Sequence, residues 1–88
     1  MIRQQLTIQN KLGLHTRAAA KLVDTAKQYS SRIELGFRDR IVDAKSIMGV
    51  ITLGAQKDNA IDVIISGDDE EAALEAITQL INGKFGEE

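Results

Sequence analysis

The chain has 88 residues and contains no cysteine. Neither a disulfide bond nor a thiolate metal site can therefore stabilise it, and nothing in it requires an oxidising compartment. Its single histidine cannot supply the usual ligand set of a zinc site either. We therefore expect a cytoplasmic protein that holds neither a metal ion nor a cofactor.

Aromatic residues, long apolar runs and net charge are also scarce. One tyrosine, two phenylalanines and no tryptophan leave no platform on which nucleic-acid bases can stack. No stretch approaches the ~20 apolar residues that span a bilayer, and the first residues lack the apolar run of a signal peptide. The net charge is only -2, so the chain has no general attraction to nucleic acid or anionic membranes. We expect a soluble protein that neither binds nucleic acid nor inserts into a membrane.

The apolar residues that are present recur with the periods of short secondary-structure elements. Alternation of apolar and polar residues predicts four strands, at 2–9, 32–37, 40–43 and 61–65. The second and third of these are joined by a hairpin turn near Arg38 and Asp39. The elements must pack efficiently, because at this length apolar burial and the loss of chain entropy nearly cancel.

Helical spacing accounts for the segments between the strands. Residues 16 to about 29 carry an apolar helical stripe that starts with three alanines. The apolar run 47–53 fits either a strand or a helix, and Ser46 as N-cap favours a helix. A final helix begins within the acidic run 68–71, where Asp68 and Glu71 have capping-box spacing, and stops near Gly83.

These elements follow one another in the order β-α-β-β-α-β-α. A mainly antiparallel four-stranded sheet, with the helices on one face and solvent on the other, buries every apolar stripe in two layers. We therefore predict an α+β fold in one domain, residues 1–88.

The residue with the clearest chemistry is His15, the only histidine. It follows a glycine-containing loop and precedes the alanine-rich helix, whose first N–H groups, those of Thr16, Arg17 and Ala18, lack helical partners. These donors, the helix dipole and the charge of Arg17 favour an anion at this position. The same positive surroundings disfavour imidazolium, and a neutral ring is the form able to attack phosphorus. His15 is therefore a candidate phosphoryl acceptor, with Arg17 as its charged partner.

A second interpretation of His15 is that it only caps the helix at the surface, as histidines near helix starts often do. Nothing in the sequence groups it into Ser-His-Asp or Cys-His chemistry, and its spacing from Gly13 is not that of a P-loop. The residues alone therefore leave both interpretations open, and they indicate no machinery for enzymatic turnover.

Two motifs resemble those of the HPr phosphocarrier family. They are Asn-Lys-Leu-Gly-Leu-His-Thr-Arg-Ala-Ala at 10–19 and Ala-Lys-Ser-Ile-Met-Gly at 44–49. The resemblance extends over the whole chain, in length and in the order of the elements. It implies an open-faced β-sandwich with sheet order 1-4-2-3 and three helices on one side.

The resemblance also implies a reaction. A phosphoryl group passes from phosphoenolpyruvate through Enzyme I to Nδ1 of the histidine matching His15, and then to acceptor domains of the phosphotransferase system. The arginine matching Arg17 steadies the charge during transfer. Such a protein is a covalent intermediate and not an enzyme with turnover of its own, and we expect a monomer. The sequence leaves open whether it serves sugar uptake or a nitrogen-related regulatory branch.

Two positions depart from the commonest family pattern, which has alanine where Thr16 stands and proline where Ala18 stands. Ala18 keeps a backbone N–H that proline lacks, so it offers one more donor to a phosphoryl group. Thr16 adds a hydroxyl, which either donates to the same group or competes as a helix cap.

Ser46 and the helix that follows it suggest regulation and partner binding. The Ser46 side chain as N-cap contributes about 1 kcal/mol, and the resemblance implies phosphorylation of the matching serine by HPr kinase/phosphorylase in many members. Val50 and Leu53 are expected in the core, and the residues that a short helix leaves outside form a shallow apolar surface for partner proteins. This predicted partner surface consists of Ala20, Ile47, Met48, Ile51 and Thr52.

Two alternatives to a phosphocarrier remain. The first is a regulatory adaptor, whose main output is partner binding controlled by HPr kinase/phosphorylase at Ser46. The second is an unrelated small α/β domain with a capping histidine, which requires two family motifs to occur in register by chance.

Overall fold

The computed structural model describes residues 1–87. In this part of the chain the strands are β1 (Ile2–Thr7), β2 (Arg32–Phe37), β3 (Arg40–Asp43) and β4 (Ala60–Ser66). The helices are α1 (Thr16–Ala26), α2 (Ile47–Leu53) and α3 (Glu70–Asn82), and a 3₁₀ turn, η1 (Lys84–Gly86), follows the last of them.

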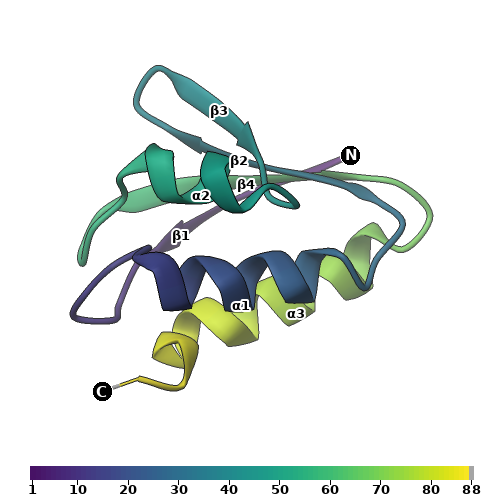
Figure 1. The fold of residues 1–88 in the computed structure, drawn as a ribbon. Coiled ribbons are helices and arrows are strands. Elements are labelled where there is room, and N and C mark those ends of the chain that lie inside the picture. Colours follow the sequence, from purple (N-terminus) through teal and green to yellow (C-terminus); the bar gives the residue numbers. More distant parts are fainter. Residues whose placement is uncertain (88) are drawn as a thin grey trace.

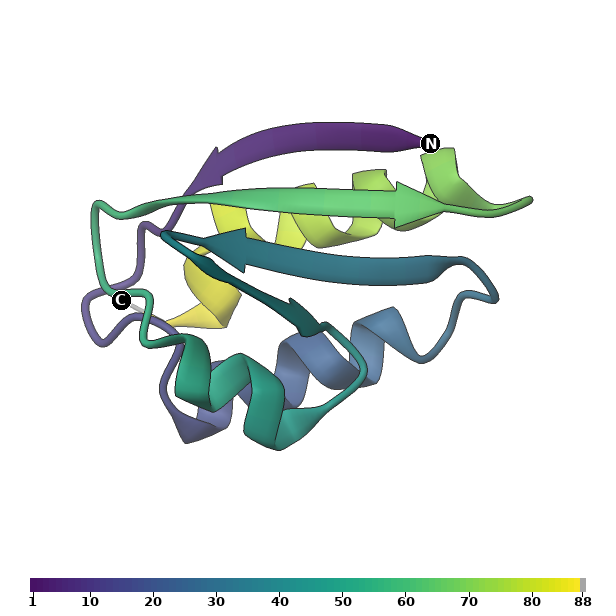
Figure 2. The same ribbon diagram turned by 90° about the horizontal axis from the view of Figure 1, so that it is seen from above.

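The strands form one antiparallel sheet in the order β1-β4-β2-β3. Figure 1 shows the sheet as the upper layer, with the helices covering its lower face. Figure 2 shows the strands side by side in the same order, with α3 behind them and with α1 and α2 in the lower part of the view, next to β3. The predicted α+β fold and its sheet order are therefore confirmed.

Alternation along the two central strands decides which face of the sheet is buried. Across the β2–β4 pair, Ile33 lies opposite Ile65 and Leu35 lies opposite Val63, and all of these side chains are buried. The helices cover this face with small and branched apolar residues, as helical spacing requires. The core contributed by the helices consists of Ala18, Ala19, Leu22, Val23, Ala26, Val50, Leu53, Ala73, Ile77 and Ile81.

Helix α1 ends at Ala26, three residues before the predicted end near residue 29. Beyond Lys27, the N–H groups of Gln28 and Tyr29 reach back by only three residues, to the carbonyls of Thr25 and Ala26. This tightening is typical of a helix terminus, and it turns the chain into the connection to β2.

The start of α3 differs from the predicted capping box. The helix begins at Glu70, within the predicted acidic run 68–71, but Glu70 rather than Glu71 reaches back, accepting a hydrogen bond from the N–H of Gly67 at 3.0 Å. Asp69 is the N-cap residue, but its carboxylate turns away from the helix toward Ser31 and its neighbour. Within residues 1–87, the capping box predicted between Asp68 and Glu71 is therefore not formed.

The carboxylate of Asp69 instead joins two loops. It accepts hydrogen bonds from the hydroxyl and N–H groups of Ser31 and of Ser30, with N···O distances of 2.9 and 2.8 Å. The Ser31 hydroxyl, followed by the N–H of Ser30, is the main cause that lowers the pKa of Asp69 to about 2. The loops approach closely because Gly67 has no side chain: an added Cβ would lie 2.5 Å from the Ser31 hydroxyl oxygen.

Gly83 caps the C-terminus of α3, as predicted. The chain then turns through η1, and Phe85 from this turn is buried in the core. Figure 1 shows that η1 lies beneath the first turn of α1. Among residues 1–87, no helix is long and apolar enough to cross a membrane.

Candidate functional site

The loop before α1 is held in place by its own backbone and by the loop before β4. Asn10 is fully buried, and its Nδ2 donates to the carbonyl of Gly13 at 2.7 Å while the Gly13 N–H donates to the Asn10 carbonyl at 3.1 Å. Gly13 has a φ of 67°, and an added Cβ would lie 2.7 Å from the carbonyl oxygen of Ala55. Only glycine fits this contact without displacing the loop. The next N–H, of Leu14, donates to the same Ala55 carbonyl at 3.0 Å.

This loop delivers His15 to the start of α1, as predicted. His15 is the N-cap residue, with extended backbone angles, and its carbonyl accepts the first helical hydrogen bond, from Ala19, at 2.8 Å. Within residues 1–87 the imidazole makes no capping bond to the helix. The N–H groups of Thr16, Arg17 and Ala18 thus precede the first helical bond, where the end of a helix offers free donors to an anion.

The side chains of these three residues lie in different surroundings. Those of Thr16 and Arg17 are exposed, whereas that of Ala18 is fully buried against the core. The Thr16 hydroxyl does not replace the cap, because Thr16 is already the first helical residue. The site therefore combines a half-buried imidazole, three backbone N–H donors and a long, exposed arginine side chain at one end of a helix.

The structure adds one residue that the sequence analysis missed, Glu87. Its Oε2 lies 2.6 Å from Nε2 of His15, and its Oε1 accepts a hydrogen bond from Nδ2 of Asn10 at 3.1 Å. The side chains of His15 and Glu87 are 24% and 11% exposed, so this contact is largely shielded from water. The two residues are 72 positions apart, and no motif or period links them.

The charge state of Glu87 follows from its neighbours. Burial opposes ionisation, but the hydrogen bonds from Asn10 and His15, together with electrostatic attraction to His15 and Arg17, outweigh it and lower the pKa of Glu87. The assumption drawn from the sequence was that the imidazole has positive surroundings. An ionised carboxylate on Nε2 instead favours a proton on that nitrogen, which corrects this assumption.

The hydroxyl of Ser46 caps α2, as predicted. Its Oγ accepts a hydrogen bond from the N–H of Gly49 at 3.1 Å, and the helix ends at Gly54, which has a left-handed φ of 75°. Ser46 is half-buried, and the two residues after it are exposed. A group added to the Ser46 hydroxyl would thus lie beside exposed apolar side chains.

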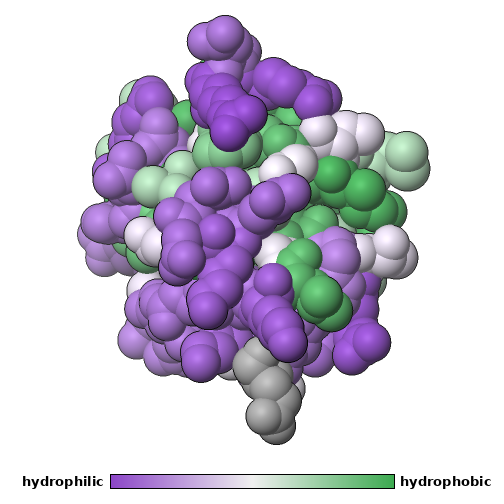
Figure 3. Space-filling view, turned by 90° about the vertical axis from the view of Figure 1, so that its left-hand side faces the viewer, coloured by the Kyte–Doolittle hydropathy of each residue, from purple (hydrophilic) through white to green (hydrophobic). Residues whose placement is uncertain are grey.

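The five predicted partner-surface residues differ in exposure. Met48 is 66% and Ile47 is 37% exposed, and Thr52 is exposed as well, whereas Ala20 and Ile51 are half-buried. Val50 and Leu53 are buried, as predicted. Leu12, in the loop before His15, is 63% exposed, and the sequence analysis did not include it. Figure 3 shows apolar side chains gathered toward one side of this end of the molecule, with polar side chains over the rest.

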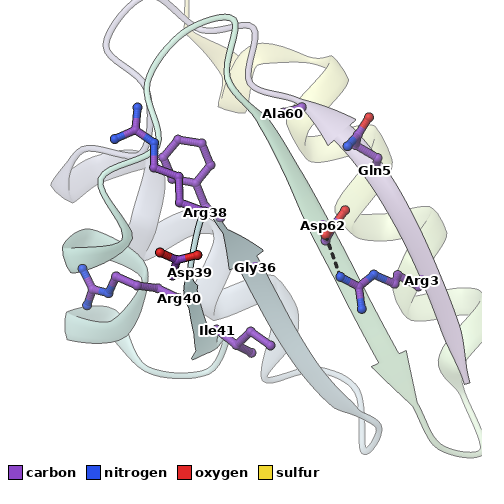
Figure 4. A pocket seen from close by; sticks show the side chains of 10 residues that line it. Arg3, Gln5, Gly36, Arg38, Asp39, Arg40, Ile41, Ala60 and Asp62 are labelled. Carbon is purple, nitrogen blue, oxygen red and sulfur yellow. Dashed lines mark hydrogen bonds and ion pairs between the residues drawn. The ribbon is translucent and has the colours of Figure 1, made fainter.

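Two of the hollows on the surface of residues 1–87 contain arginine side chains. One, of about 310 Å³, adjoins the site and is lined by Lys11, Leu12, Arg17 and Glu87. The other, also of about 310 Å³, lies on the open face of the sheet (Figure 4).

The hollow on the sheet contains arginines that are already engaged. Arg3 pairs with Asp62 at 2.9 Å, Arg38 lies over the ring of Phe37, and Arg40 donates to the carbonyl of Thr52. Because these charges have partners within the chain, the hollow beside His15 is the better candidate for a functional site.

Comparisons with known proteins show the family of the chain. Residues 2–83 match the family model described as the PTS HPr component phosphorylation site. A phosphocarrier protein HPr from Xylella fastidiosa strain Temecula1 is 46% identical over 88 residues, which cover 100% of this chain and 99% of the relative.

Solved structures agree as well. A crystal structure of HPr from Thermoanaerobacter tengcongensis superposes with a TM-score of 0.96 at 45% identity, covering 100% of this chain and 99% of that one. A crystal structure of an HPr dimer from the same organism gives a TM-score of 0.80 at 45% identity, with 99% and 100% covered. The resemblance found in the sequence is thus confirmed: the chain belongs to the HPr family of phosphocarrier proteins.

Proposed function

We propose that His15 is the residue on which this phosphocarrier holds its phosphoryl group. The observation that carries the proposal is the position of the imidazole at the start of α1, next to three N–H groups that precede the first helical bond. These donors and the helix dipole stabilise the negative oxygens of a phosphoryl group. Arg17 adds a permanent positive charge from an exposed position, where it can follow the group during transfer.

The donor in this proposal is phosphorylated Enzyme I, and the acceptors are domains of the phosphotransferase system. His15 takes the group at Nδ1 and gives it up again, so the chain is a substrate of its partners and has no turnover of its own. The half-exposed ring suits this role, because a partner's active site must reach it from outside.

The test is incubation with Enzyme I and phosphoenolpyruvate, followed by measurement of the intact mass before and after mild acid. We expect a gain of one phosphoryl group that mild acid removes, because phosphohistidine is acid-labile, and no gain in His15→Ala. An absent gain in the wild type, or a gain that survives both acid and His15→Ala, would overturn the proposal.

The partner surface in this proposal consists of Ala20, Ile47, Met48, Ile51 and Thr52. Its support is the exposure of Ile47 and Met48 on α2, which packs against α1. Exposed apolar side chains with an adaptable methionine suit brief contacts with several proteins. We expect the carrier itself to act as a cytoplasmic monomer, although its T. tengcongensis relative has been crystallised as a dimer. Light scattering of the purified chain at micromolar concentration decides between the two states.

A second function is favoured by Ser46. Its half-buried hydroxyl lies at the start of α2, directly before exposed Ile47. A phosphate there adds about two negative charges beside the apolar surface, which repels acidic partners and raises the cost of desolvation. We propose that HPr kinase/phosphorylase modifies Ser46 and thereby lowers transfer to and from His15. An acid-stable mass gain with ATP and this kinase, absent in Ser46→Ala, is the expected result; the same gain in Ser46→Ala would contradict it.

A further inference from the structure

The segment after α3 is fixed against the helix that carries His15. Lys84, Phe85 and Gly86 have consecutive φ values of 58°, 56° and 75°, a left-handed path that residues other than glycine rarely take. Such a path persists only where the surroundings enforce it. Here Phe85 is 1% exposed in the core, and Lys21 of α1 donates from Nζ to the Phe85 carbonyl at 2.6 Å.

This anchored segment places the carboxylate of Glu87 with both oxygens in use. Oε1 accepts from the fully buried Asn10, whose same Nδ2 also holds the Gly13 carbonyl, and Oε2 faces Nε2 of His15. A carboxylate can only accept hydrogen bonds, so Nε2 is the nitrogen that carries the proton. The lone pair of the neutral ring is then on Nδ1.

We propose that Glu87 is a positioning residue for phosphoryl transfer, which holds the proton of the His15 ring on Nε2, orients Nδ1 toward the donor, and balances the charge that the ring gains. The inference rests on the proposed function, because it assigns a role in the chemistry of the same histidine. A carboxylate that orients an imidazole through its second nitrogen is a general device for making the first nitrogen an effective nucleophile.

The electron balance of the step explains the role. The Nδ1 lone pair forms a bond to phosphorus, and the bond from phosphorus to the donor's nitrogen breaks, with its electron pair staying on the donor. The Nε2 proton remains on the ring, so the ring becomes cationic, and the Glu87 carboxylate stabilises that charge. In onward transfer the electron pair of the P–Nδ1 bond returns to the ring, which is again neutral with its proton on Nε2.

The negative charge of the Glu87 carboxylate also repels a phosphoryl group on the same ring. Glu87 and the phosphoryl group both carry negative charge, but they bind to different nitrogens on opposite edges of the ring. Between them lies the imidazole, and the helix N-terminus and Arg17 contribute opposing positive charge. The attraction acts over one 2.6 Å hydrogen bond, whereas the repulsion acts over the longer distance across the ring.

The first part of the test observes the contact itself by NMR of the histidine-labelled full chain. A hydrogen bond to a shielded carboxylate slows exchange of the Nε2 proton with water, so we expect a visible imidazole N–H resonance on Nε2 in the wild type. Glu87→Ala should lose this resonance, whereas Glu87→Gln, which keeps an acceptor oxygen without the charge, should retain part of it.

The second part measures phosphoryl transfer from Enzyme I with the carrier as variable substrate. We expect Glu87→Ala to lower kcat about tenfold and to change KM less than twofold, with Glu87→Gln between it and the wild type. Glu75→Ala is the matched control, because Glu75 is an exposed glutamate on α3 whose removal changes the net charge equally. It should transfer at the wild-type rate.

The outcomes separate this inference from the proposed function. If wild-type chain gains no acid-labile phosphoryl group, the proposed function fails, while the NMR measurement still tests the contact. If the wild type is phosphorylated but Glu87→Ala matches it in kcat, or transfers faster, the positioning role is refuted and the function of His15 stands. A proton observed on Nδ1 in place of Nε2 would refute it equally.

Discussion

Substituting Gly13 by alanine tests how tightly the loop that carries His15 is built. A left-handed φ disfavours alanine by about 1–2 kcal/mol. Alanine also lowers the conformational entropy of the unfolded chain, which stabilises the folded state by about 0.4–1 kcal/mol. The added Cβ would also lie 2.7 Å from the Ala55 carbonyl oxygen and 2.8 Å from Cα of Gln56. Both are backbone atoms, so the loop itself must move, which costs a further ~1–3 kcal/mol. We expect a loss of about 3 kcal/mol in the free energy of unfolding.

Gly54 offers a matched control within the same chain. Its φ of 75° is equally left-handed, but the nearest atom to an added Cβ is a carbonyl oxygen at 4.0 Å. Gly54→Ala therefore has the conformational penalty but no steric clash, and we expect it to lower the free energy of unfolding by about 1 kcal/mol.

Urea unfolding followed by circular dichroism compares the two variants with the wild type. We expect Gly13→Ala to be less stable than Gly54→Ala by about 2 kcal/mol, which corresponds to roughly 8–16 °C in Tm for a domain of this size. Gly13→Ala should also transfer phosphoryl groups more slowly, because the loop holds His15. Equal stabilities of the two variants, within about 0.5 kcal/mol, would refute the steric argument.

Three further predictions concern other parts of the molecule. The pKa of Asp69 is lowered from 3.8 to about 2, so its stabilising contribution is present above about pH 4 and is lost as pH falls toward 2; urea titrations across this range should show a smaller decline in Asp69→Asn than in wild type. Ala18→Pro removes one N–H donor worth ~1 kcal/mol, so the phosphorylation equilibrium with Enzyme I should shift about fivefold away from the carrier, and an unchanged equilibrium would count against a donor role. Met48→Asp should raise KM for Enzyme I while changing stability by less than about 0.5 kcal/mol, and an unaltered KM would remove Met48 from the partner surface.

Much of the fold was predictable because its signals are local. The two-residue period of β2 and β4 and the helical spacing of α1 can be recognised from neighbouring residues alone. The Ser46 cap can be recognised from the three residues that follow it. The sheet order did not come from these periods: it followed from the resemblance to a family, because strand neighbours are set by contacts distant in sequence.

The candidate site was predictable in part for the same reason. His15 and the donors after it follow from the start of a helix, which the sequence marks clearly. Glu87 does not, because its contact depends on three left-handed residues, on the burial of Phe85 and on Lys21 of α1. No sequence rule predicts that lysine and phenylalanine take left-handed angles together, so the path of this segment was visible only in the structure.

The pairing of β1 with β4 has a consequence for how the chain folds. Ile2 lies opposite Ile65 and Thr7 opposite Ala60, so the first strand has its sheet neighbour more than fifty positions away. Closing so long a loop delays the contact, since its entropy must be lost before the pairing is gained. The loop that carries His15 also depends on the chain just before β4, because the Leu14 N–H donates to the Ala55 carbonyl. The histidine, although early in the sequence, thus acquires its surroundings late in folding, and a chain interrupted before β4 would present it on an unstructured segment.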